Sequence, residues 1–172
     1  MNEELKPKEA ANMVKKDHVN WIDVESTNEA MVQEVTELFT IHHLVAEDIL
    51  NLDQLPKFEL FDQHLFFNTK MLNFDDNETL ILKEHLSIVM SKNLLITFQE
   101  GIPGDAFSEL RLRIQLAKGI IRKYEVDYLF YHILDAVVIH YLQIMETLRE
   151  RIESLESRAL ADPRYDAAGI RN

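Results

Sequence analysis

Residues 42–67 read HHLVAEDILNLDQLPKFELFDQHLFF, and the pattern of apolar residues changes within this stretch. The first part predicts a short helix over residues 44–50, which Pro56 prevents from extending far. From residue 58 the chain is rich in Phe and Leu, which predicts two extended runs bent near residues 62–63. The stretch therefore marks the point where helices give way to a sheet.

The segment before this stretch predicts one strand and one helix. Residues 18–24 carry the apolar side chains of a short strand. Ser26 or Thr27 offers an N-cap, and residues 27–41 have apolar side chains at helical spacing. A strand and a helix thus precede the helix of residues 44–50.

The segment after it predicts a hairpin and a further helix. Residues 73–79 form a cluster of turn residues, and two strands follow within 80–100, joined at residues 91–93. An amphipathic helix over 105–118 comes next, and Gly119 is suited to stop it. Strands and helices mixed in this order predict an α/β domain.

The last predicted element is a long helix from residue 125 to residue 161, ended by Asp162–Pro163. Its apolar residues alternate steps of four and three, which is a heptad seam. The seam consists of Leu134, Val138, Tyr141, Met145, Leu148, Ile152, Leu155 and Ala159. The simplest alternative is an amphipathic helix packed on its own sheet. A helix of ~37 residues would be about 55 Å long, so we expect part of it to project and to need a partner.

The composition sets limits on the class of protein. The chain has 172 residues, 47% of them hydrophobic, which suits one domain or a domain with an appendage. It has no cysteine, which excludes disulfides, thiolate metal sites and cysteine nucleophiles. The formal net charge is -12, which repels nucleic acid and attracts cations or basic partners. An acidic surface that serves only solubility is the alternative.

No segment is expected to cross a membrane, and no secretory signal is recognisable at the start of the chain. The most apolar run, residues 129–142, is shorter than the ~20 residues that a span needs. It also contains His132, Asp135 and His140, which are costly in lipid. The chain as given is therefore expected to be soluble.

Candidate catalytic chemistry is sparse. His43 and Glu47 lie one helical turn apart and could bind a transition metal, but no third ligand lies at a spacing typical of a metal-binding motif. A helix end, or a contact between the acids and Lys57, explains this stretch more simply. The chain has neither a nucleophile elbow nor a glycine-rich phosphate loop, so it is not expected to be an enzyme.

Three aspartates are candidate cation ligands. Asp75 and Asp76 stand in the predicted turn after the strands, and hard cations such as Mg2+ prefer carboxylate oxygens. A solvated turn is the alternative for this pair. Asp135 lies in the most apolar part of the long helix, where a carboxylate should have a partner or face an interface.

These residues resemble the signature region of the CorA-type divalent-cation channel family, in which His-Pro-Leu-x-x-Glu-Asp-Ile precedes Gln-Pro-Lys-x-Glu and two apolar strands. The matching positions are His42, Leu44, Glu47, Asp48, Ile49, Gln54, Lys57 and Glu59. The later segments NLLITFQE and RLRIQLAKGIIRKYEVDYLFYHILDAVVIHYL follow in the family's order, so the resemblance covers residues 18–162. The departures are His43, where the family often has Pro, and Leu55–Pro56, where it has Arg-Pro.

The resemblance implies an α/β/α sandwich with a mixed central β-sheet and a long C-terminal helix. It implies a cytoplasmic domain core over residues 1–124, a long helix over 125–162 and the start of a linker over 163–172. The stalk and the transmembrane helices of the family lie beyond this sequence. By the same resemblance, the complete protein would be a pentamer in the inner membrane, with this domain on the cytoplasmic side.

The resemblance also implies regulatory Mg2+ sites between subunits, with Co2+ or Zn2+ as other ions. Asp75 matches one family ligand, Asp76 lies beside it, and Asp135 matches a ligand of a second site. Ile139 stands where the family has another acid of that second site, which leaves its integrity open. The alternatives are a zinc transporter of the ZntB type, a freestanding acidic metal-binding module, and a hydrolase that uses His43 and Glu47.

Overall fold

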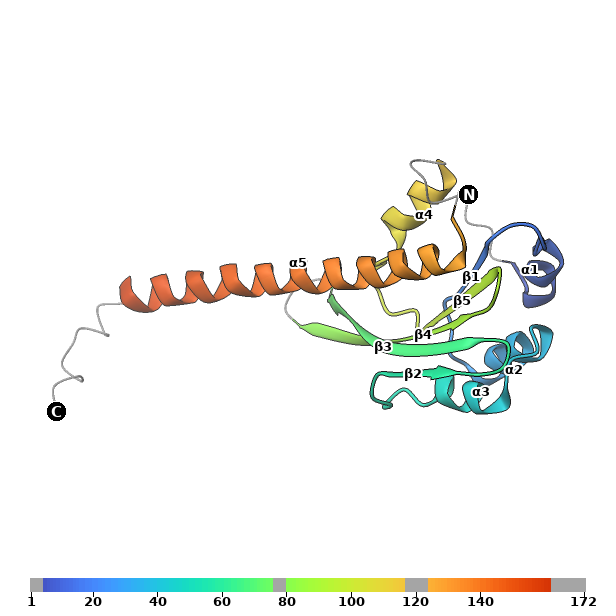
Figure 1. Cartoon of the computed structure of the whole chain (residues 1–172). Coiled ribbons are helices and arrows are strands. Elements are labelled where there is room, and N and C mark those ends of the chain that lie inside the picture. Colours follow the sequence, from blue (N-terminus) through green and yellow to red (C-terminus); the bar gives the residue numbers. More distant parts are fainter. Residues whose placement is uncertain (1–4, 76–79, 117–123, 162–172) are drawn as a thin grey trace.

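The computed structural model describes residues 5–75, 80–116 and 124–161, which form a five-stranded sheet between two layers of helices (Figure 1). The strand order is β1-β5-β4-β3-β2. The strands are β1 (Asn20–Val24), β2 (Lys57–Leu60), β3 (Leu65–Phe74), β4 (Ile81–Met90) and β5 (Leu94–Gln99). Only the pair β1–β5 is parallel, so the sheet is mixed, as predicted.

The predicted hairpins are present at the predicted places. β2 and β3 are antiparallel, with Leu60 opposite Leu65, so the bend lies at residues 61–64. β4 and β5 are joined at residues 91–93, where Ser91 N–H donates to the Leu94 carbonyl at 2.8 Å. Buried and half-buried side chains alternate along much of β3, because successive side chains point to opposite faces of a sheet and both faces are covered.

One face of the sheet is covered by α2 (Glu29–Leu38) and α3 (His43–Leu50). Its core joins Val32, Val35, Val45 and Ile49 of these helices to Phe66, Val89, Ile96 and Phe98 of the sheet. The expected N-cap of α2 was wrong. Asn28 caps the helix, accepting from Met31 N–H at 2.8 Å, while the Ser26 hydroxyl accepts from the Asn28 side chain.

A short helix, α1 (Pro7–Met13), precedes β1 and was not predicted. None of its residues is buried, so its sequence carries little of the apolar periodicity by which helices are recognised. Its signal is the start PKE, because Pro at the first helical position has a suitable backbone angle and needs no hydrogen-bond partner.

The opposite face is covered by α4 (Ser108–Gln115) and α5 (Val126–Ala161) (Figure 1). Leu110, Leu129 and Ile133 of these helices, together with Phe107 just before α4, pack on Met71, Leu86 and Ile88 of the sheet. The α/β/α sandwich is thus confirmed. α4 is shorter than the predicted 105–118, and Gly119 lies outside the described residues.

The long helix α5 packs on the sheet through a line of buried residues that differs from most of the predicted heptad seam, although the seam residues Leu134 and Tyr141 also pack against the core. Leu129, Ile133, Val137 and Ile144 are buried, whereas the seam residues Val138, Met145, Ile152 and Leu155 are 53% to 64% exposed. The helix extends well beyond the sheet (Figure 1). The exposed members of the seam therefore form an apolar stripe without a covering element among the described residues. The predicted end at Asp162–Pro163 lies outside them.

The length and composition of α5 would also allow residues Val126–Leu160 to cross a bilayer, unlike the shorter run considered in the sequence. Such a signal from one helix is weak, because the core helix of a soluble protein meets the same criteria. The first half of α5 packs against the sheet through Leu129 and Ile133, which accounts for its apolar character.

Candidate functional site

Asp75 follows the last residue of β3 and helps to close the turn between β3 and β4. Its backbone N–H donates to the Leu80 carbonyl at 2.9 Å, and its Oδ1 accepts from Leu80 N–H at 2.7 Å. The side chain is half-buried. The hairpin thus holds this carboxylate in a fixed place at one end of the sheet. Asp76, the second candidate in the turn, lies outside the described residues.

Asp135 is half-buried on α5, among exposed apolar side chains of the neighbouring turns that include Tyr131, Val138 and Ile139. Its charge acts on His132, one turn earlier. The pKa of His132 is lowered by burial and by the charge of Arg113, while Asp135 acts in the opposite direction. Asp135 is therefore electrostatically coupled to one buried histidine rather than to a second acid.

The described residues bring no group of three His, Asp or Glu side chains together in a way that could hold a metal ion. Asp75 and Asp135 are thus not joined into one site within this part of the subunit. A cation bound at either aspartate would need further oxygen ligands, from water or from another chain, because hard cations take about six or more.

The pair His43 and Glu47 gains no third metal ligand from the described residues. Both side chains are exposed on α3, and no third ligand stands beside them in the described part of the chain. Instead, His42 begins the helix: its Nδ1 accepts from Leu44 N–H at 3.2 Å. The expectation that a histidine helps to start this helix is confirmed.

Asp48 belongs to a closed ring of hydrogen bonds, here called the signature ring and formed by Asp48, Gln54, Lys57 and Asn68. Asp48 pairs with Lys57 Nζ at 2.5 Å and accepts from the Gln54 amide at 2.9 Å. Gln54 accepts from the Asn68 amide at 3.0 Å, and Asn68 Oδ1 accepts from Lys57 N–H at 2.6 Å. The ring ties α3 to β2 and β3, so these motif residues hold the fold together.

The charges within the signature ring support each other. Burial lowers the pKa of Lys57, but the hydrogen bonds and negative charges of Asp48 and Glu59 outweigh it and leave that pKa above its usual value. Asp48 and Lys57 were expected to meet, whereas Asn68 was not singled out. A signal for it was available: Asn68 is a polar residue inside the apolar strand LFFNTKML.

Sequence reasoning also missed two buried titratable residues in β4. Glu84 is 1% exposed, and its Oε1 accepts from Gly101 N–H at 3.0 Å and Ile102 N–H at 3.2 Å. Burial raises the pKa of Glu84 despite these hydrogen bonds. The adjacent His85 is completely buried on the other face. The signal for both is the charged triplet KEH within a predicted strand.

His85 is held between two polar side chains. Its Nδ1 lies 2.8 Å from Lys70 Nζ and its Nε2 lies 3.0 Å from Ser87 Oγ. Lys70 also donates to the Leu52 carbonyl. Burial and the positive charge of Lys70 lower the pKa of His85 to about 4. A neutral imidazole can accept from Lys70 and donate to Ser87, so this cluster is a structural bridge.

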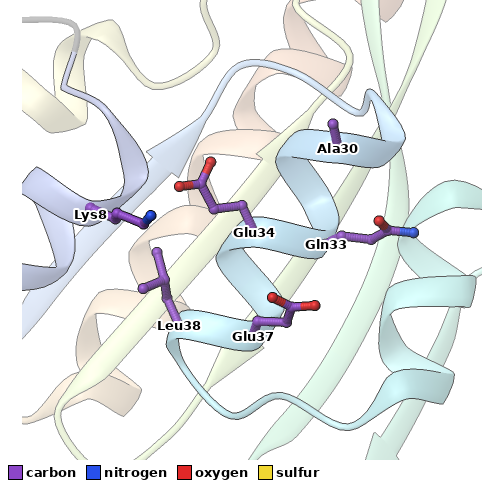
Figure 2. A pocket seen from close by; sticks show the side chains of 6 residues that line it. All are labelled: Lys8, Ala30, Gln33, Glu34, Glu37 and Leu38. Carbon is purple, nitrogen blue, oxygen red and sulfur yellow. The ribbon is translucent and has the colours of Figure 1, made fainter.

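A surface hollow of about 470 Å³ lies between α1 and α2, at the other end of the sheet from the β3–β4 turn (Figure 1). It is lined by Lys8, Ala30, Gln33, Glu34, Glu37 and Leu38 (Figure 2). Its polar side chains all lie on the surfaces of α1 and α2, and none belongs to the candidate cation residues. The hollow therefore adds nothing to the site at Asp75.

Solved structures share this fold. The complete CorA magnesium transporter of Methanocaldococcus jannaschii matches with a TM-score of 0.71 and 23% identity, over 88% of this chain and 48% of that chain. The soluble domain of the same protein matches with a TM-score of 0.68 and 23% identity, over 84% of this chain and 57% of that chain. The cytoplasmic domain of ZntB from Vibrio parahaemolyticus matches with a TM-score of 0.64 and 16% identity, over 78% of this chain and 53% of that chain. The fold is thus that of the soluble domain found in these transport proteins.

Sequence comparison gives the family. A family model described as "CorA-like Mg2+ transporter protein" matches residues 16–169 of this chain. The cobalt/magnesium transport protein CorA of Thermotoga maritima is 41% identical over 144 residues, which are 83% of this chain and 41% of that protein. This chain belongs to the CorA-like Mg2+ transporter protein family. It spans about two fifths of the length of the Thermotoga relative.

Proposed function

We propose that this chain is the cytoplasmic, cation-sensing domain of a CorA-like channel that moves Mg2+ and Co2+. The complete protein would be a pentamer in the inner membrane, with α5 leading toward the stalk. The observation that carries the proposal is the place of Asp75. It is a half-buried carboxylate fixed by the β3–β4 hairpin, in a part of the chain that assembles no three-ligand metal group of its own.

The proposed mechanism is a shift between two states of the assembled protein. A Mg2+ ion at Asp75 would be shared with a carboxylate of the neighbouring subunit and would offset their repulsion, which favours a closed state. Loss of the ion would leave acidic surfaces facing each other. The formal net charge of -12 per chain makes this repulsion substantial.

Asp135 is proposed as a ligand of a second site, with Asp76 as an additional ligand near Asp75. Asp135 is surrounded by exposed apolar side chains such as Val138 and Ile139, which a covering helix would bury. A carboxylate enclosed in that way needs a cation or another partner. Because Ile139 cannot bind a cation, we expect the second site to contribute less than the site at Asp75.

The test is protection of the complete protein against proteolysis by Mg2+. Asp75→Ala should lower the protection, because it removes a ligand oxygen from the shared site. Asp127→Ala is the matched control, since Asp127 is an exposed acid on α5 outside both proposed sites. Equal protection of the Asp75 variant and the parent protein would exclude Asp75 as a sensor.

A ZntB-like zinc transporter is the second candidate, and the match to the ZntB cytoplasmic domain favours it as the alternative. Uptake of Mg2+, Co2+ and Zn2+ by the complete protein distinguishes the two. The reading frame beyond codon 172 tests whether a stalk and transmembrane helices follow. A freestanding metal-binding module would have neither. The hydrolase alternative requires that a hydrolytic activity of the chain be lost when both His43 and Glu47 are changed to Ala.

A further inference from the structure

The N-terminus of α3 is capped by an imidazole instead of the usual hydroxyl, amide or carboxylate. The Nδ1 atom of His42 accepts from Leu44 N–H at 3.2 Å. Most helices use Ser, Thr, Asp or Asn at this position, and these side chains accept a hydrogen bond at any pH near neutrality. An imidazole nitrogen accepts only while it carries no proton. The cap of α3 therefore exists only when His42 is neutral.

A stack of rings connects this cap to the turn between β2 and β3. The ring of His42 lies 4.4 Å from that of His43 and 5.3 Å from that of Phe61. Phe61 in turn stacks on His64 at 5.0 Å, and its N–H donates to the His64 carbonyl at 2.8 Å. The first turn of α3 is thus attached to the sheet through aromatic rings, three of which are titratable.

The segment that leads into this cap is strained. Thr40 has a φ of 54°, in the left-handed region that a β-branched residue rarely adopts. An open hollow of about 110 Å³ lies against it, lined among others by Thr40, Ile41 and His64. The link between α2 and α3 is therefore strained and borders a hollow at the protein surface.

The titratable groups around His42 are histidines rather than acids. His43 faces it from α3, and His64 faces it from the β2–β3 turn. Burial and the charge of His42 lower the pKa of His64, whose Nε2 is buried without a hydrogen-bond partner. The α2–α3 link contributes Thr40 and Ile41, which do not titrate. Asp62 and Glu47 are exposed, and no ion pair joins a carboxylate to His42 in the described ranges.

We propose that His42 is a proton-controlled N-cap, and that its protonation releases the first turn of α3 from the β2–β3 turn. Protonated Nδ1 becomes a donor that faces Leu44 N–H and the positive end of the helix dipole. The new charge also lies among other imidazoles without a carboxylate to balance it. This local response to acid is independent of any cation bound at Asp75.

Hydrogen exchange by NMR on the 172-residue chain tests the proposal, read as protection factors of the α3 amides between pH 8 and pH 5.5. In the parent chain we expect the protection factors of the Leu44 and Val45 amides to fall by about tenfold, because this corresponds to the stabilisation that an N-cap usually provides. His42→Asn should keep the protection at every pH, because an amide oxygen caps without titrating. His42→Ala should show low protection throughout, and His43→Asn is the matched control that keeps the parent's pH dependence.

The proposal does not depend on whether the variants fold. The nitrogen chemical shifts of the His42 ring in the parent chain report the proton on Nδ1 directly. We expect Nδ1 to gain its proton over the same pH range in which Leu44 loses protection. Constant protection of Leu44 through the titration of His42 would refute the proposal. The same pH dependence in His42→Asn as in the parent chain would also refute it.

Discussion

The signature ring and the outer half of α5 satisfy their side chains in opposite ways. In the ring, Asp48, Gln54, Lys57 and Asn68 all find partners inside the subunit. On α5, the seam residues Met145, Ile152 and Leu155 are more than half exposed and have no covering element in the described structure. The most recognisable motif of the chain is therefore scaffold. The part left without partners in the described structure is the exposed apolar stripe of α5.

The largest effect should come from breaking the ring at its buried member. Asn68→Leu leaves Lys57 N–H and the Gln54 side chain without their partners. Each orphaned group costs about 1–3 kcal/mol, so we expect a loss of about 4 kcal/mol in the free energy of unfolding. Urea denaturation measures it. Thr69→Val, the next position of β3, is the control and should cost less than about 1 kcal/mol. A similar loss in both variants would mean that the ring contributes little.

A smaller effect should follow from acid, through His85. Its pKa in the folded chain is about 4, below its usual 6.5, so the unfolded chain binds more protons between these values. Stability is therefore complete above about pH 6.5 and falls as the pH decreases toward 4, by at most about 3 kcal/mol from this residue. Urea denaturation at several pH values checks the slope. His85→Gln, which does not titrate, should be less stable at neutral pH but lose less on acidification.

The strands were more predictable than the polar contacts, for a physical reason. The hairpin at residues 91–93 and the bend at 61–64 depend on local turn residues and on apolar alternation, both visible in the sequence. The partners of Glu84 lie at Gly101 and Ile102, and the ring joins Asp48 to Asn68 through Gln54. Such contacts depend on strand order and register, which a single sequence does not specify.

The candidate cation site was predictable only in part. The place of Asp75 at the end of a strand follows from the change between the apolar run KMLNF and the acidic residues after it. The sequence could not show whether other ligands lie near Asp75. The structure shows that the described residues assemble no three-ligand group. The cap of α2 was misplaced because Ser26, Thr27 and Asn28 are consecutive cap formers, and only the backbone shows which of them starts the helix.

Substitutions in the exposed seam of α5 should have the smallest effect on stability. We expect them to change the association of the chain with itself. The double substitution Met145→Glu and Ile152→Glu alters exposed side chains, so the free energy of unfolding should change by less than about 0.5 kcal/mol. We expect the parent chain to self-associate through the seam and the variant to do so at least tenfold more weakly. Sedimentation velocity over a range of concentrations measures this.

The control for the seam is Leu112→Glu, which alters an exposed leucine of α4. It should leave the association of the parent chain unchanged. If the parent chain stays monomeric at all concentrations, the exposed seam alone is insufficient for pairing. A covering segment from the complete protein would then be required.

The length of α5 has a mechanical consequence. The helix has 36 residues. Its contacts with the sheet include the Tyr141 hydroxyl, which donates to the Lys70 carbonyl, and the Arg151 guanidinium, which lies over the Phe74 ring. The rest of the helix extends beyond the sheet (Figure 1). At 1.5 Å per residue the whole helix is about 54 Å long, so a tilt of about 5° at its base moves its tip by roughly 4–5 Å. A small change of angle where α5 meets β3 is thus enlarged along the helix into a displacement of several ångströms at its tip.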